Sequence, residues 1–360
     1  MSTRDTPAPG ALADVQPRPS IRPQWLALVE EPALEPDLPI IDPHHHFALH
    51  GAEDYGLADL AADTSSGHRI EATVYIECRA GYRPDGPLEL RPVGETEGVL
   101  GMMGDAPPSP TLPHEGGGGS PPTRFCAGIV CYADLMLGTA VRPVLEAQIA
   151  AGRGRVKGIR NSTVSHADPN ARGAAVNRPA GMLLDPRLRE GFACLAPLGL
   201  TFDSWIYHTQ VGELTDLARA YPDTVVVLDH VSGILGIGPY SGRREETFRE
   251  WRRALVDFAA CANARVKLGG LGMPLFGFGF HEQVRPPGSE RLAAAWRPYI
   301  ETAIELMGAE RCMFESNFPV DKASCAYGVL WNAFKRITAD CSASEKAALY
   351  SGTARRTYRL

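Results

Sequence analysis

The sequence predicts an α/β protein folded as a (β/α)8 TIM barrel, on two observations. Eight short apolar runs rich in Val, Ile, Phe and Tyr recur along the chain, and amphipathic stretches lie between them. A strand followed by a helix, repeated eight times, indicates a parallel sheet that closes into a barrel. A doubly wound open sheet is the alternative, but no GxGxxG motif follows the first run.

The predicted strands are short and apolar, in keeping with strands buried on both faces. They are Pro39–Asp42, Ala72–Cys78, Ala127–Tyr132, Val156–Arg160, Leu200–Tyr207, Thr224–Asp229, Ala264–Leu268 and Cys312–Ser316.

The predicted helices follow from spacing and capping. Asp185 precedes a proline, a combination typical of a helix start, and Ser342 with Glu345 forms the pattern of a capping box. The helical stretches are Thr139–Ala151, Pro186–Pro197, Val211–Tyr221, Arg243–Cys261 and Ser289–Met307, with a last helix after Ser342.

Composition restricts the class of protein. The chain has 360 residues, of which 44% are hydrophobic and 22% charged, as in globular enzymes. A net charge of −6 argues against a nucleic-acid partner, and no apolar run is long enough for a membrane helix. Eight scattered cysteines without a CxxC pair, and a polar N-terminal segment, predict reduced thiols and a cytoplasmic location.

Two segments stand apart from the barrel at residues 39–360. Residues 1–38 hold seven prolines and are expected to form an extended arm. Residues 101–124 are of low complexity and include GGGGS, so we expect a flexible insertion that can be deleted without loss of activity. His114 and Glu115 inside it are therefore not expected to be catalytic.

Histidines gather at three predicted strand ends, where the active site of a barrel lies. His44 and His46 are two residues apart, so both can face the barrel axis while His45 turns away. With His208 and His230 they could surround one divalent cation, since neutral imidazole is a good Zn²⁺ ligand. A polar pocket of hydrogen-bonding histidines without a metal is the alternative.

These motifs resemble the amidohydrolase superfamily over about residues 39–360. The resemblance rests on Asp42-Pro-His-His-His46, Gly158-Ile-Arg160, His208, Leu228-Asp-His230 and Met313-Phe-Glu-Ser-Asn-Phe-Pro319, in the right order at the right strands. It is greatest to the lactonase-like branch, predicted metal-dependent hydrolases that include 2-pyrone-4,6-dicarboxylate lactonase and sugar lactonases.

The resemblance implies hydrolysis of a small, carboxylated lactone and a divalent metal, most readily zinc, on His44, His46 and His208. His208 would also act in catalysis with His230, which would help to manage the proton. Amide hydrolysis or decarboxylation on the same barrel stays an alternative. Asn317 stands where the superfamily usually has an aspartate that accepts a proton from water, which an amide cannot do.

That departure leaves the general base open. Glu315, Asp321 and Glu77 are the candidates, with a buried ion pair as the alternative role for Glu315 and a helix cap for Asp321. A protein without a base would be a non-catalytic binder of small molecules, which is the second class of function.

Basic side chains near the strand ends predict an anionic small-molecule substrate. Arg79, Arg83, Arg160 and Lys267 either bind carboxylates or form salt bridges inside the barrel, and both roles stay open.

Aromatic side chains on the same face complete the expected site. Tyr82 and Tyr240 could donate hydrogen bonds to a developing oxyanion. Phe278, in the glycine-rich loop 269–281, is expected to cover the substrate as part of a lid. Packing of that loop on the N-terminal arm or on a second subunit of a homo-oligomer is the alternative.

Overall fold

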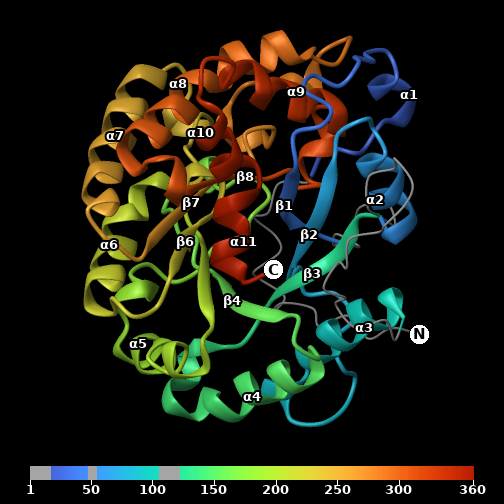
Figure 1. The fold of residues 1–360 in the computed structure, drawn as a ribbon. Coiled ribbons are helices and arrows are strands. Elements are labelled where there is room, and N and C mark those ends of the chain that lie inside the picture. Colours follow the sequence, from blue (N-terminus) through green and yellow to red (C-terminus); the bar gives the residue numbers. More distant parts are fainter. Residues whose placement is uncertain (1–17, 48–54, 105–121) are drawn as a thin grey trace.

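The computed structural model describes residues 18–47, 55–104 and 122–360, and it confirms the predicted barrel. Eight parallel strands pair in the order in which they occur in the chain (Figure 1). Their bounds are β1 Ile40–His45, β2 Ile70–Ile76, β3 Arg124–Cys131, β4 Val156–Ser162, β5 Thr201–Trp205, β6 Val226–Leu228, β7 Ala264–Leu268 and β8 Cys312–Phe314.

The sheet closes between its last and first strands, just beyond the end of β8. The amide of Asn317 donates to the carbonyl of His44 at 2.9 Å, and the amide of His46 donates to that of Phe318 at 2.8 Å. The closing hydrogen bonds therefore join residues 44–46 to the residues that follow β8. They fix these two parts of the chain against each other.

The helices lie outside the sheet, as the βα repeat requires (Figure 1). They are α1 Pro23–Leu26, α2 Leu57–Thr64, α3 Val93–Met103, α4 Arg142–Ala151, α5 Pro186–Phe192, α6 Val211–Ala220, α7 Arg244–Ala259, α8 Ser289–Met307, α9 Tyr327–Ile337, α10 Ala343–Ala347 and α11 Thr353–Tyr358. The expected capping box is present, since the Ser342 amide donates to Glu345 Oε2 at 2.8 Å.

Helix α11 covers the end of the barrel opposite the strand ends that carry the histidines, and Figure 1 looks onto it. Tyr358 of this helix is fully buried and packs with an apolar layer inside the barrel. That layer includes Ile41, Val74, Val130, Val227 and Met313. This apolar layer and helix α11 thus close that end of the barrel, so the charged side chains deeper inside are shielded from solvent on that side.

The described part of the N-terminal arm is bound to the barrel. Trp25 Nε1 donates to the carbonyls of Gln283 and Val284 at 3.0 and 3.1 Å, and Arg22 donates to that of His281 at 2.5 Å. The arm therefore packs on the loop that follows β7. Most of the expected insertion, residues 105–121, lies outside the described residues, as do His114 and Glu115.

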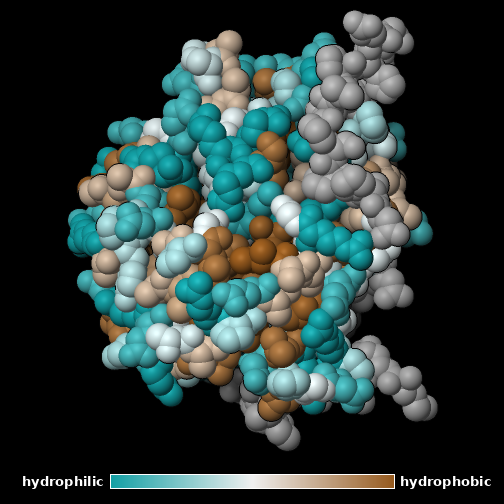
Figure 2. Space-filling model, turned by 60° about the horizontal axis from the view of Figure 1, so that its bottom comes forward, coloured by the Kyte–Doolittle hydropathy of each residue, from teal (hydrophilic) through white to brown (hydrophobic). Residues whose placement is uncertain are grey.

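The surface in Figure 2 is largely hydrophilic, with hydrophobic side chains gathered near the middle of that face. None of the described helices is both long and apolar enough to cross a membrane.

Candidate active site

A pocket with a cavity of about 210 Å³ opens beside the histidine-bearing strand ends. Three parts of the chain form its walls: the arm, the strand ends, and the loops after β4 and β7. The polar side chains that line it are Arg18, His46, Glu77, Arg79, Arg160, Ser162, Arg178, His230 and Asn317. Its apolar wall includes Ile21, Ala175, Val176, Trp205, Met273 and Leu275.

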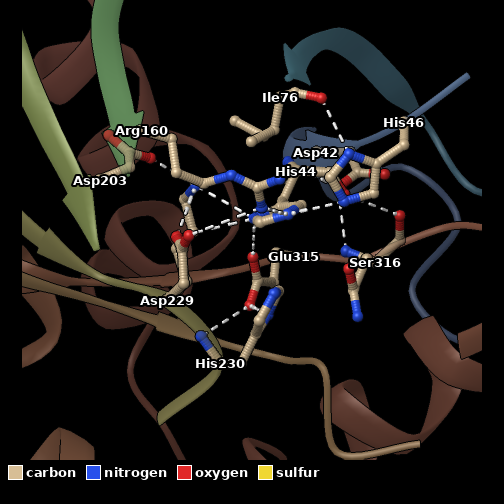
Figure 3. A network of polar contacts seen from close by, with 12 residues as sticks. Asp42, His44, His46, Ile76, Arg160, Asp203, Asp229, His230, Glu315 and Ser316 are labelled. Atoms are coloured by element: carbon tan, nitrogen blue, oxygen red, sulfur yellow. Dashed lines mark hydrogen bonds and ion pairs between the residues drawn. The ribbon is translucent and has the colours of Figure 1, made fainter. Parts of the chain in front are cut away.

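His44 lies at the centre of the polar network beneath this pocket (Figure 3). Its Nδ1 lies 2.8 Å from Oε2 of Glu315 and 3.2 Å from Nζ of Lys267. The shorter contact, to an anion, favours a proton on Nδ1. The other ring nitrogen, Nε2, lies 3.2 Å from Nε2 of His46.

The other two imidazoles are oriented in the same way. His46 Nδ1 lies 2.8 Å from the carbonyl oxygen of Ile76, which can only accept, so Nδ1 carries the proton. His230 Nδ1 lies 2.6 Å from Oε1 of Glu315. The Nδ1 atoms of His46 and His230 are therefore held by acceptors, whereas Nδ1 of His44 faces both Glu315 and Lys267.

Glu315 holds two of the three imidazoles at once. Burial opposes its charge, but His230 and His44 outweigh this and keep the pKa of Glu315 at about 2. Oxygen and nitrogen atoms of His44, His230 and Glu315 lie within 4.8 Å of one another. Since both carboxylate oxygens already face imidazole nitrogens, we interpret Glu315 as the group that orients the ligands.

Two glycines after β7 make this close approach possible. A Cβ on Gly269 would lie 2.4 Å from Cγ of Glu315, and one on Gly270 would lie 2.6 Å from the His230 ring. His230 itself has a φ of 54°, which is uncommon for a residue with a side chain. The backbone is thus shaped to bring His230 to the carboxylate.

The histidines have the protonation state that a metal requires. Burial, followed by the charge of Lys267, lowers the pKa of His44 well below its usual value. Burial, Arg160 and, to a smaller extent, Arg18 do the same for His46. Both rings are therefore neutral near pH 7. Two neutral Nε2 lone pairs 3.2 Å apart repel each other unless a cation or a proton lies between them, so the donor set fits a divalent metal.

Ion pairs fill the barrel interior beneath the histidines, as the salt-bridge interpretation predicted. Lys267 is fully buried, and its Nζ lies 2.7 Å from Asp203 and 3.1 Å from Asp229. The hydroxyl of Tyr358 donates to Asp203 at 2.6 Å. Despite burial, these carboxylates raise the pKa of Lys267 above its ordinary value, so it stays charged.

Arg160 and Glu77 form a second pair, at the edge of the pocket. Arg160 Nε donates to Glu77 Oε1 at 2.9 Å, and Arg160 Nη1 lies 3.3 Å from His44 Nε2. The other oxygen of Glu77, Oε2, is buried and has no hydrogen-bond partner within the described ranges. This pair therefore brings a free carboxylate oxygen to the neighbourhood of the His44–His46 pair.

Asn317 lines the pocket, and its amide nitrogen donates to Asp321 Oδ1 at 3.3 Å. Asp321 is fully buried behind it and accepts from the Gly272 amide, so it is not the helix cap that the sequence suggested. Burial raises the pKa of Asp321 to about 7.

Two expected site residues, His208 and Tyr240, lie outside the pocket. His208 accepts from the Leu235 amide and packs against Tyr240, which in turn contacts His166 at 3.1 Å. The metal-capable group found in the described ranges is His44, His230 and Glu315, so of the predicted ligands it contains His44 but neither His46 nor His208.

Phe278 is also outside the pocket, contrary to expectation. It stacks on Phe280 and lies under the guanidinium of Arg244, in a groove between α7 and α8. The neighbouring residues Met273 and Leu275 line the pocket instead. Tyr82 has a buried hydroxyl close to Glu77 and Glu95, whose charges add to burial in raising its pKa, and it too is not a pocket-lining residue.

Three of the pocket residues that sequence reasoning missed are Arg18, Arg178 and Trp205. Arg18 belongs to the proline-rich arm, Arg178 to a loop without regular structure, and Trp205 to the end of β5, where only polar residues were considered. No periodic pattern in the sequence marks the first two.

Comparison with known proteins agrees with this geometry. A family model described as amidohydrolase matches residues 123–360. The chain belongs to the amidohydrolase family. It is 32% identical to the uncharacterized protein y4mH of Sinorhizobium fredii, over 90% of this chain and 99% of that protein.

Two further amidohydrolase relatives bear on the site. An L-fucono-1,5-lactonase of Burkholderia multivorans is 23% identical over 89% of this chain and 96% of its own. A crystal structure of an amidohydrolase from Burkholderia multivorans with bound zinc superimposes with a TM-score of 0.64 at 22% identity, covering 89% and 99% of the two chains. This amidohydrolase is therefore an enzyme with the family's barrel.

Proposed function

We propose that this amidohydrolase hydrolyses a small lactone bearing an anionic group, with a divalent metal held by His44, His46 and His230 beside Glu315. The single observation that carries the proposal is the gathering of these side chains: the Nε2 atoms of His44 and His46 lie 3.2 Å apart, and donor atoms of His44, His230 and Glu315 lie within 4.8 Å of one another. A named lactonase among the relatives supports the choice of ester over amide or carboxylate substrates.

A bound divalent cation would supply Lewis-acid chemistry, polarising a carbonyl and lowering the pKa of water. The chain's own residues supply the rest. Glu315 orients the rings of His44 and His230. Lys267, itself held by Asp203, contacts His44 from below. Arg79, which has no acidic partner among the described residues, lines the pocket and attracts an anionic substrate.

We assign the proton-accepting role to Glu77. It is the only carboxylate among the described residues that line the pocket, and its Oε2 has no partner in that part of the chain. Arg160 holds its other oxygen beside His44. Asn317 cannot accept a proton, and Asp321 lies behind it, so Glu77 takes the place of the aspartate that the family usually has after β8.

Metal content tests the proposal. His230 after β6 is a proposed ligand and His208 after β5 is not, so the alanine variants of these two histidines form a matched pair. We expect about one equivalent of metal in purified protein by mass spectrometry, lost in His44→Ala and His230→Ala and kept in His208→Ala. Glu77→Gln should keep the metal and lose at least about a hundredfold in kcat on lactones followed with a pH indicator. Metal retained by His230→Ala, or full activity of Glu77→Gln, would overturn the corresponding assignment.

A further inference from the structure

Three arginines that line the pocket have no acidic partner in the described part of the chain. They are Arg18 from the arm, Arg79 after β2 and Arg178 after β4. Arg160 differs, because Glu77 neutralises it. A guanidinium keeps its charge near neutral pH, so three arginines without an acidic partner make this cavity positively charged and favour the entry of anions.

Arg18 is the one of these arginines that the barrel itself does not supply. The arm that carries it is fixed by Trp25, whose indole donates to Gln283 and Val284, and by Arg22, which donates to His281 and lies 4.0 Å over the Trp25 ring. Pro19 and Ile21 line the pocket beside Arg18, on the same cavity as Met273 and Leu275. The arm is therefore a wall of the substrate site.

The charge of Arg18 reaches the histidine centre. Arg18 and His46 line the same cavity. An anion beside Arg18 would thus sit within electrostatic range of the site while leaving the His44–His46 pair to the reacting carbonyl.

The rest of the wall is poor in neutral hydrogen-bonding groups. Among the described lining residues, Ser162 and Asn317 are the only side chains with an uncharged hydroxyl or amide. Proline, alanine and valine side chains fill much of the remainder. Guanidinium groups bind carboxylates more strongly than hydroxyls, and the apolar part of the wall matches an apolar ring, so a ring with charged substituents fits this lining.

We propose that Arg18 is a specificity-determining residue that binds a second anionic group of the substrate, on an otherwise apolar ring, so that the N-terminal arm selects dianions over monoanions and sugars. The proposal rests on the proposed function for the identity of the reacting group, but its test needs no turnover.

The test compares two flat ring acids, benzoate with one carboxylate and isophthalate with two, by titration calorimetry on the full chain. Wild type should bind isophthalate about tenfold or more tightly than benzoate, as expected for one added charge-assisted contact. Arg18→Gln should remove most of that preference and leave benzoate affinity unchanged. Arg187→Gln, an exposed arginine paired with Asp185, controls for the change in net charge and should behave as wild type.

A second variant tests the role of the arm. Trp25→Ala removes the anchor and keeps Arg18, and it should lose the isophthalate preference to a similar extent, with an unchanged far-ultraviolet spectrum as evidence of folding. Equal affinities of wild type for the two acids, an equal loss for both in Arg18→Gln, or full preference in Trp25→Ala would overturn the proposal. An Arg18-dependent preference in a protein that hydrolyses no lactone would instead leave this inference standing and reject the proposed function.

Discussion

Charged groups inside the barrel and those at the pocket wall are arranged in opposite ways. Inside, fully buried Lys267 lies within 3.1 Å of two carboxylates, and one of these also accepts from Tyr358. At the wall, Arg18 and Arg79 have no acidic partner in the described ranges, although Arg79 lies 5.4 Å over the ring of Tyr132. Both regions hold cations, but at the wall Arg160 alone of the described lining arginines is paired with a carboxylate, that of Glu77.

This difference in pairing distinguishes the charges that support the site from those that are available to bind a ligand. A buried ion has to be paired because its desolvation is expensive, so Lys267 and its partners form a fixed support under the histidines. A cation that faces a cavity can remain unpaired because solvent or substrate completes it. Positively charged side chains thus support the structure inside the barrel and serve recognition at the pocket wall.

Breaking the interior network should have the largest effect on stability. Lys267→Met leaves Asp203 and Asp229 buried together without their cation, which we expect to lower the free energy of unfolding by about 3–5 kcal/mol. Lys157→Met, also on a strand but with no acidic partner among the described residues, should cost less than about 1 kcal/mol. Urea unfolding of both variants measures the difference, and a similar loss in the two would refute the supporting role.

The fold could be predicted from the sequence much further than the site could. The β7 and α8 bounds were predicted without error, because short apolar runs and a long amphipathic stretch are local signals. Helices α2 and α3 were not predicted: α2 is only eight residues long, and three glycines weaken the pattern of α3.

The site was predicted in part, where strand alternation decides it. His44 and His46 face inward and His45 faces out, as the two-residue period requires. The choice between His208 and His230 depended on loop geometry: His230 has a φ of 54°, and glycine at 270 leaves room for its ring. Arg18 reaches the pocket only through the tertiary contacts of Trp25, which no local pattern reveals.

Lowering the pH should have the next largest effect on the free energy of unfolding, because the buried histidine His45 is neutral in the folded protein. His45 is fully buried, its Nε2 contacts Thr73 Oγ1 at 2.9 Å, and burial lowers its pKa from 6.5 to about 3. The unfolded chain therefore binds a proton below pH 6.5 that the folded chain refuses, so this stability is complete above pH 6.5 and is lost as pH falls toward 3.

The expected loss is at most about 1.4 kcal/mol per pH unit for His45 alone. Urea unfolding between pH 7.5 and 5, with a chelator present so that metal release adds nothing, should show a shallower slope for His45→Phe than for wild type. Parallel slopes for the two proteins would mean that His45 is protonated in the folded state.

The smallest effect should come from Phe278, which sharpens the boundary of the pocket wall. Phe278→Ala removes a ring that stacks on Phe280 and lies 4.4 Å from the Arg244 guanidinium, so we expect a loss of about 1–2 kcal/mol in stability. Its isophthalate affinity and kcat/KM should stay within about twofold of wild type. Leu275 lies in the same loop and lines the pocket, so Leu275→Ala should weaken isophthalate binding more than Phe278→Ala does. If the order of the two variants is reversed, Phe278 contacts the substrate after all, and the loop moves on binding.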